Sequence, residues 1–282
     1  MADRAQALHY YARVLRTVMG VVVGLLGAYV ALATLAFVGQ RALMYPRPSG
    51  QIEPNASGAR MERISAAGGT RACALYVPAP QGRPTVVHFH GNGEDLSDQT
   101  TLVEELAERG LGVYAVEYPG YGLLRDEALS EHAVYTSAEA ALRHLHDRLG
   151  VAPRDVVLQG QSLGTGVAVE MARRGHAARL ILISPFTSMT DMARKLLPWL
   201  PVSLLVRDRY ETKQKVSALS LPVLILHGTA DEVIPVSMGR RVADLLPNAK
   251  LVLIEGGGHN DLFTLHGQRV LSEIVAFAGA AD

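Results

Sequence analysis

A serine between two glycines is the strongest chemical signal in the sequence. The pattern is Gly160-Gln161-Ser162-Leu163-Gly164, and it stands between a short apolar run and a stretch with helical spacing. A tight strand–turn–helix of this kind exposes the serine hydroxyl, and it needs the supporting glycines because side chains there would collide with neighbouring backbone. We therefore expect Ser162 to be a catalytic nucleophile, with the backbone N–H of Leu163 facing a developing oxyanion. The alternative is a glycine-rich turn with an ordinary capping serine.

A serine hydroxyl needs a general base, and His259 is the best placed of the ten histidines. It follows three glycines on a loop between an apolar run and a helical stretch, so its imidazole should lie at the end of a strand. His227 ends another apolar run, and we expect it to support its loop rather than to move protons.

An orienting carboxylate should hold that base, and Asp231 is the preferred residue. It stands on the loop that leaves the apolar run ending at His227, closer to the strand end than Glu232 or Asp261. The chain order Ser162, Asp231, His259 is one of the known orders for such a triad.

A second oxyanion donor is expected in the turn after residues 85–90. His90 and Gly91 should support this turn, and the backbone N–H of Asn92 should point at the same oxygen as that of Leu163. The competing interpretation is a metal site, with the candidate ligands His88, His90, Glu94 and Asp95. We expect no metal, because this turn is where the oxyanion loop is needed. No phosphate-binding loop or dinucleotide fingerprint is present, so no cofactor is expected.

The overall composition excludes several other classes. The chain has 27 basic and 27 acidic residues, which argues against a nucleic-acid partner bound through a broad basic surface. Its single cysteine, Cys73, excludes an intramolecular disulfide. Hydrophobic residues make up 49% of the chain, which is too many for a disordered protein.

These reactive positions must be held by an alternating α/β framework. Short runs of Val, Ile and Leu without strict alternation predict buried strands of a mostly parallel sheet. The predicted strands are residues 71–77, 85–90, 111–116, 155–159, 180–183, 221–226 and 251–254. The predicted helices are residues 102–109, 137–149, a segment ending at 174 and a segment near the C-terminus. Residues 185–220 interrupt the alternation with three prolines and are expected to form a small cap inserted after a strand.

A long uncharged stretch precedes this framework. Residues 17–40 carry no charge, and as a helix they would span about 36 Å, enough to cross a bilayer core of about 30 Å. We expect a single-pass transmembrane anchor, between a cytoplasmic segment (1–16) and a linker (41–59), followed by the catalytic domain (60–282). A buried helix and a cleaved signal peptide are the alternatives.

The charges on the two sides of this stretch favour a cytoplasmic N-terminus and an extracytoplasmic catalytic domain. Gly20 and Gly24 form a small-residue pair that could join two anchors into a homodimer.

Taken together, these motifs resemble the α/β-hydrolase superfamily. The elbow around Ser162, the His-Gly-Asn-Gly turn, Glu117–Gly122 (EYPGYG) and Ser184–Ser188 (SPFTS) are similar to the membrane-anchored branch with one span and a small cap. That branch includes depalmitoylating and lysophospholipase-type members. The resemblance implies an eight-stranded, mostly parallel sheet flanked by helices. Gly93-Glu94 departs from the branch, whose members tend to have Ala-Gly after His-Gly-Asn.

The expected function is cleavage of carboxylic esters or thioesters of an acyl lipid or another small acylated substrate, beside membrane lipid. An apolar stretch of the cap, Leu196–Pro201, could shelter a fatty chain or could simply pack against the domain. A peptidase for short peptides is the alternative, with Asp191 as a possible partner for a free amino terminus. A catalytically inactive, membrane-tethered binding protein is the second alternative.

Overall fold

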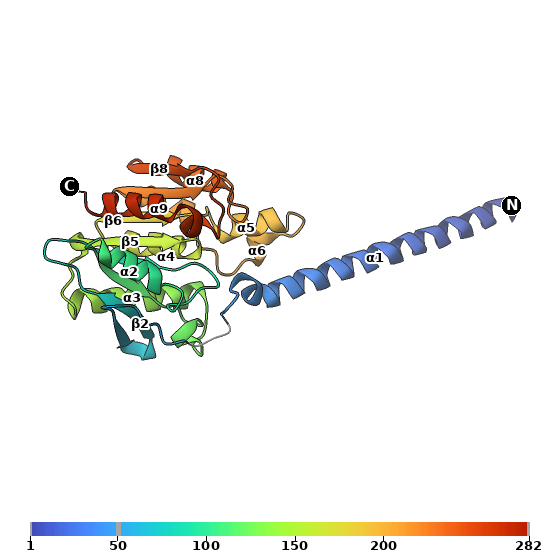
Figure 1. Ribbon diagram of the computed structural model, residues 1–282. Helices are drawn as coiled ribbons and strands as arrows, with labels where there is room; N and C mark the ends of the chain where they lie inside the picture. Colours follow the sequence, from blue (N-terminus) through green and yellow to red (C-terminus); the bar gives the residue numbers. More distant parts are fainter. Residues whose placement is uncertain (1, 49–51, 281–282) are drawn as a thin grey trace. The chain divides into compact units, whose positions relative to one another are not determined.

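The computed structural model describes residues 2–48 and 52–280, which divide into two compact units. The first unit ends at Met44, and the second begins at Tyr45. Figure 1 shows the helices and strands of both units.

The first unit is one helix, α1 (Ala2–Met44). Its segment Leu8–Met44 has a mean hydropathy of 2.4 in its most apolar window, so by length and composition it could cross a membrane, although a signal sequence would pass the same test. The hydroxyls of Thr17 and Thr34 donate to the backbone carbonyls of Arg13 and Val30. Because these hydroxyls are satisfied within the helix, they are compatible with an apolar surrounding.

The second unit is built on an eight-stranded sheet with the order β1-β2-β4-β3-β5-β6-β7-β8. β1 and β4 each pair antiparallel with β2, and all other neighbours are parallel. The strands are β1 (Arg60–Ser65), β2 (Arg71–Val77), β3 (Thr85–Phe89), β4 (Gly112–Val116), β5 (Val156–Gln161), β6 (Arg179–Ile183), β7 (Val223–Gly228) and β8 (Ala249–Ile254). The predicted mostly parallel α/β sheet is therefore confirmed.

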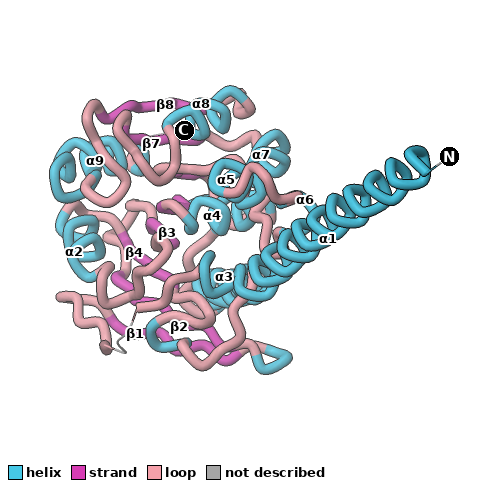
Figure 2. The backbone as a smooth tube through the Cα atoms, turned by 90° about the vertical axis from the view of Figure 1, so that its right-hand side faces the viewer, coloured by secondary structure: helices cyan, strands magenta, loops and turns pink. Residues whose placement is uncertain are grey.

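Helices cover both faces of this sheet. α2 and α9 lie on one face, and α3, α4 and α8 lie on the other (Figure 2). The bounds are α2 (Thr100–Glu108), α3 (Glu131–Asp147), α4 (Leu163–Arg173), α8 (Val236–Asp244) and α9 (Leu262–Ala278). Because both faces are covered, every residue of β3, β4 and β7 is buried, which explains their continuous apolar sequences.

Several elements differ from the sequence prediction. β1 was not predicted, because it is an edge strand with mostly polar, partly exposed residues. α8 was not predicted either. α3 begins six residues earlier than predicted, because the Ser130 hydroxyl accepts a hydrogen bond from the N–H of Ala133 and caps the helix at Glu131.

The segment between β6 and β7 contains three short helices: α5 (Met189–Leu196), α6 (Val202–Leu205) and α7 (Thr212–Lys215). Ion pairs hold this insertion. Lys213 pairs with Asp191 at 2.7 Å, and Lys215 pairs with Glu170 of α4 at 3.0 Å. The insertion is therefore fixed both to itself and to the helix that follows Ser162.

Candidate active site

Ser162 occupies a strained turn between β5 and α4. Its φ is 50°, in the left-handed region that L-residues avoid, and its N–H donates to the carbonyl of Ile183 at 2.9 Å. A Cβ at Gly160 would lie 2.3 Å from the carbonyl oxygen of Gly164, and a Cβ at Gly164 would lie 2.0 Å from that of Phe89. Only glycine fits at either position, so the two glycines allow the backbone contacts that present the serine.

The structure brings Ser162, His259 and Asp231 together from three separate loops. His259 Nε2 lies 3.1 Å from Ser162 Oγ, and His259 Nδ1 lies 2.8 Å from Asp231 Oδ2. A carboxylate only accepts hydrogen bonds, so Nδ1–H donates to Asp231 and Nε2 is left to accept from the serine. This is the arrangement in which an imidazole can take the proton of a serine hydroxyl.

Asp231 is held in its ionised form by its surroundings. Its side chain is fully buried, and Oδ1 accepts the backbone N–H groups of Val233 at 3.0 Å and Ile234 at 2.7 Å. Burial alone would raise the pKa of this carboxyl, but interactions with His227, His259 and the N–H of Ile234 hold it well below its usual range. His227, which we expected to support the loop, donates to the carbonyl of Ile234 at 2.9 Å.

The two rival carboxylates contact backbone groups of the same loop. Glu232 Oε2 accepts the N–H of His259 at 3.4 Å, and Asp261 Oδ1 accepts the N–H of Gly258 at 2.7 Å. They hold the loop that carries His259, whereas Asp231 holds its imidazole.

The turn after β3 approaches Ser162 closely. A Cβ at Gly91 would lie 3.7 Å from the Cβ of Ser162. The N–H of Gly91 donates to Glu94 Oε2 at 2.8 Å, so this amide is engaged by the side chain that marks the departure from the related turn. Among the turn's amides, that of Asn92 remains our predicted oxyanion donor, together with that of Leu163 at the first residue of α4.

A buried layer that the sequence did not assign supports this turn. Glu117 Oε1 lies 3.0 Å from His90 Nε2, and both side chains are fully buried. Burial opposes the charged form of His90, but the hydrogen bond and the negative charge of Glu117 prevail and raise the pKa of the imidazole. The hydroxyl of Tyr118 donates to the carbonyl of His90 at 2.9 Å, and that of Tyr121 donates to Asn92 Oδ1 at 2.6 Å.

Gly122 completes this layer, since a Cβ there would lie 2.1 Å from Glu117 Oε2. The segment Glu117–Gly122, which drew attention only as part of the resemblance, therefore fixes the backbone around Asn92. The spacing of its tyrosines and glycines gave no signal of which atom each would contact.

The residues of the alternative metal site are engaged elsewhere. His88 Nε2–H donates to Gln99 at 3.0 Å, and His88 Nδ1 accepts from Gln159 at 3.0 Å. Burial lowers the pKa of His88 to about 3, so it is neutral. Asp95 Oδ1 accepts from the backbone and the hydroxyl of Ser97. Within residues 2–48 and 52–280, no group of three or more His, Cys, Asp or Glu side chains could hold a metal ion.

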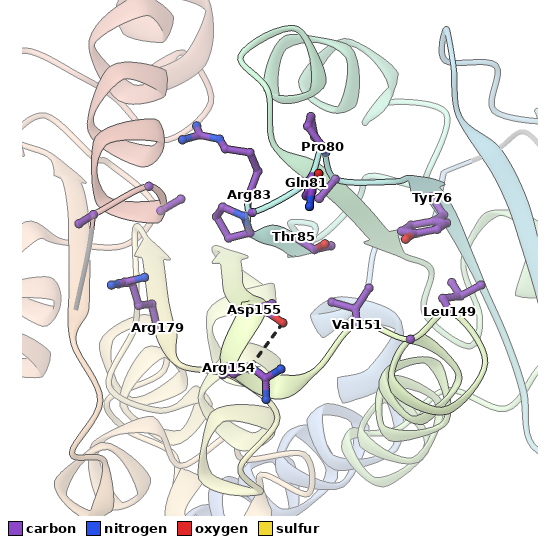
Figure 3. Close-up of a pocket in the computed structure, with 17 residues that line it drawn as sticks. Tyr76, Pro80, Gln81, Arg83, Thr85, Leu149, Val151, Arg154, Asp155 and Arg179 are labelled. Carbon is purple, nitrogen blue, oxygen red and sulfur yellow. Dashed lines mark ion pairs between the residues drawn. The ribbon is translucent and has the colours of Figure 1, made fainter.

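A hollow of about 740 Å³ lies at the other end of the sheet. Thr85, Asp155 and Arg179, which line it, stand at the amino ends of β3, β5 and β6, and Arg83 and Arg154 add positive charge (Figure 3). Ser162, Asp231 and His259 are not part of its lining. The candidate active site is therefore not this hollow.

Comparison with known proteins gives two family matches. The family described as "Serine aminopeptidase, S33" matches residues 80–213, and the family described as "TAP-like protein" matches residues 201–277.

Several curated proteins are similar to most of the chain. An uncharacterised protein of Mycobacterium tuberculosis is 32% identical over 259 residues, which are 89% of this chain and 92% of that protein. A putative α/β hydrolase of Acanthamoeba polyphaga mimivirus is 32% identical over 71% of this chain and 75% of its own length. Human α/β hydrolase domain-containing protein 17C is 35% identical over 67% of this chain, and the match spans only 57% of the human protein.

Solved esterase structures share the fold. The Pyrococcus furiosus esterase Pf2001 superposes with a TM-score of 0.65 at 14% identity, over 82% of this chain and 97% of the esterase. A Thermogutta terrifontis esterase superposes with a TM-score of 0.62 at 21% identity, over 78% of this chain and 91% of the esterase. With the eight-stranded sheet, the strained serine turn and the mimiviral relative, these similarities show that the chain belongs to the α/β-hydrolase superfamily.

Proposed function

We propose that the protein is a membrane-anchored serine hydrolase that cleaves carboxylic ester or thioester bonds through Ser162, His259 and Asp231. The observation that carries the proposal is the continuous line of contacts from Asp231 through His259 to the strained Ser162. The depth of Asp231 and its two backbone donors fix the imidazole in the orientation that acyl transfer requires.

In this mechanism His259 Nε2 removes the proton of Ser162 Oγ, which attacks the acyl carbonyl. The N–H groups of Leu163 and Asn92 stabilise the oxyanion. His259 then protonates the leaving alcohol or thiol, and an acyl-enzyme remains. Water, deprotonated by the same imidazole, releases the acid. Asp231 stays ionised and stabilises the imidazolium that forms twice in the cycle.

We favour esters and thioesters over peptides as the proposed substrates. The aminopeptidase description of one matched family favours peptides, and that activity needs a carboxylate for a free amino terminus. Asp191, the carboxylate we considered for this role, pairs with Lys213 at 2.7 Å and Arg194 at 2.8 Å and accepts the hydroxyl of Thr187 at 2.8 Å. A carboxylate with two cations and a hydroxyl already bound is poorly suited to receive a third cation.

The decisive experiment is labelling of the full chain in detergent with a fluorophosphonate probe, combined with hydrolysis of a short p-nitrophenyl ester. Ser162→Ala should abolish labelling and lower turnover by about 10³-fold or more. Ser184→Ala is the matched control, because Ser184 is another serine with positive φ (49°) directly after a strand, but it is buried. Ser184→Ala should keep the probe labelling and the ester turnover of the parent chain.

Labelling of Ser162→Ala at the rate of the parent chain would overturn the proposal. Absence of labelling in the parent chain would favour the inactive binding protein instead. A parent chain that hydrolyses aminoacyl amides faster than esters or thioesters would establish the peptidase alternative.

A further inference from the structure

Most exposed large apolar side chains of the hydrolase unit belong to the insertion or follow Asp231 and His259 closely in the chain. Outside α1, six large hydrophobic residues of the described chain are exposed. Leu196, Trp199 and Leu204 belong to the insertion between β6 and β7, with exposed fractions of 71%, 49% and 80%. Val233 follows Asp231 by two residues, and Leu265 lies in the first turn of α9, just after the loop of His259. Only Ile52 lies outside these three segments.

The insertion also carries exposed positive charge. Residues 185–220 hold six Lys or Arg and three Asp or Glu, in a chain whose total charge is zero. Arg194, Lys195, Arg207 and Arg209 are exposed, while Asp208 is buried. Exposed Leu and Trp flanked by Lys and Arg are typical of surfaces that lie in the interfacial region of an anionic bilayer.

The chain leaving α1 is fixed to the same part of the hydrolase unit. Tyr45, the first residue of this unit, is 2% exposed, and its hydroxyl lies 3.2 Å from that of Tyr210, between α6 and α7. The carbonyl of Pro46 lies 3.8 Å from where a Cβ of Gly93 would stand, in the turn that carries Asn92. One peptide bond joins Met44, the last residue of α1, to the buried Tyr45, so the hydrolase unit begins where the apolar helix ends.

We propose that this rim, made of Leu196, Trp199, Leu204, Val233 and Leu265, docks on the anionic surface of the bilayer that α1 spans. The proposal rests on the anchored hydrolase proposed above. The apolar side chains enter the headgroup region, and the exposed Arg194, Lys195, Arg207 and Arg209 lie against the lipid phosphates. The partly exposed Ser162 then faces the membrane, and the acyl chain of the substrate enters from the lipid rather than from water. Figure 1 shows α5 and α6, which carry two of these residues, at one end of the sheet.

Trp199 is the single tryptophan of the chain and therefore reports directly on this docking. The full chain is reconstituted into vesicles of phosphatidylglycerol and phosphatidylcholine, with or without bromine at the upper acyl carbons of the phosphatidylcholine. Burial about 5–10 Å deep should give roughly twofold or greater quenching by the brominated lipid and protection from aqueous acrylamide. Replacing the anionic lipid by neutral lipid should weaken the quenching, because the insertion's cations lose their partners.

The docking would be overturned if acrylamide quenched Trp199 equally in vesicles and in dilute detergent and brominated lipid did not quench it. Ser162→Ala must keep the quenching of the parent chain, since docking does not need the nucleophile. Quenching of Trp199 by brominated lipid in an inactive chain would disprove the proposed hydrolase and leave the docking intact. An active chain whose Trp199 is not quenched would disprove the docking and leave the hydrolase intact.

A second measurement uses activity, and exposed positions are chosen so that folding is preserved. Leu204→Ser should lower kcat/KM for a long-chain ester in vesicles by about fivefold, because the variant lacks one apolar side chain that the lipid would bury. It should leave hydrolysis of a water-soluble acetate ester unchanged. Ile52→Ser is the matched control, because Ile52 is 64% exposed but lies outside the rim. Equal losses in both variants, or a loss with the acetate ester, would contradict the proposal.

Discussion

At the carboxyl ends of the strands, the buried side chains of Asp231, His90 and Glu117 each have a directional partner. Asp231 accepts two backbone N–H groups and an imidazole, and His90 is paired with Glu117. At the amino ends, Arg83 and Arg154, which line the 740 Å³ hollow, are exposed: the side chain of Arg154 is 84% exposed, and its Nε lies 3.8 Å from Asp155 Oδ2. The hollow is thus the less organised of the two regions. A site for acyl transfer needs fixed partners more than it needs volume.

The glycines of the two regions differ in the same way. Gly160 and Gly164 face backbone oxygens at distances that exclude any side chain. Gly82 and Gly150 beside the hollow have positive φ, but no heavy atom lies within 4 Å of the position that a Cβ would take there. Packing therefore requires glycine at positions 160 and 164, whereas only the conformation of a turn favours glycine at positions 82 and 150.

The largest effect that tests this contrast is expected from Gly164→Ala. Its Cβ would lie 2.0 Å from the carbonyl oxygen of Phe89, so β3 or the serine turn must shift. We expect a loss of about 3 kcal/mol or more in stability and at least about 10²-fold in kcat/KM, measured by thermal unfolding and ester hydrolysis in detergent. Gly150→Ala, with φ of 75° and open space, should cost only about 1 kcal/mol and leave kcat/KM unchanged. Similar losses in both variants would remove the distinction.

The next effect concerns the buried pair of His90 and Glu117. Glu117→Gln leaves His90 buried without a countercharge, so we expect a loss of about 3 kcal/mol near pH 6. Because the pKa of His90 is raised on folding, the stability from this charged pair is complete below the unfolded pKa of about 6.5 and is lost as the pH rises through the folded value. The difference between parent and variant should therefore narrow at alkaline pH.

Thermal unfolding of both chains between pH 5.5 and 9 tests this sign. Arg154→Gln, at the exposed end of the sheet, should change stability by less than about 0.5 kcal/mol at every pH. A gap between Glu117→Gln and the parent that widens toward alkaline pH would show that the pair is neutral in the folded chain.

The smallest effect is expected from Tyr121→Phe, which removes the hydrogen bond to Asn92 Oδ1 at 2.6 Å. Loss of one such bond should lower kcat about fivefold, with little change in KM, because the oxyanion exists only after attack on the carbonyl. Tyr114→Phe is the matched control, since this buried tyrosine donates to the carbonyl of Ala141 at 3.1 Å, away from the site. It should lower stability by a similar amount and leave kcat unchanged. Equal effects on kcat would mean that Tyr121 has no positioning role.

Much of the fold could be predicted because its strands are covered on both faces. The residues of β4 and β7 are nearly all apolar or small up to their last positions, so these strands are visible in the sequence. β1 was missed because an edge strand with mostly polar, partly exposed residues has no such run. The start of α3 depended on a hydrogen bond to Ser130, which periodicity does not reveal.

The sequence by itself determined the chemistry offered at the strand ends. The glycines around Ser162, the position of Asp231 after a strand and the glycine loop of His259 are local features, because backbone sterics and chain order act over a few residues. Only the tertiary structure decided which partners these groups have. Asp231 rather than Glu232 receives the imidazole, and Glu117 pairs with His90, because each contact joins distant segments whose separation is set by the packing of the whole sheet.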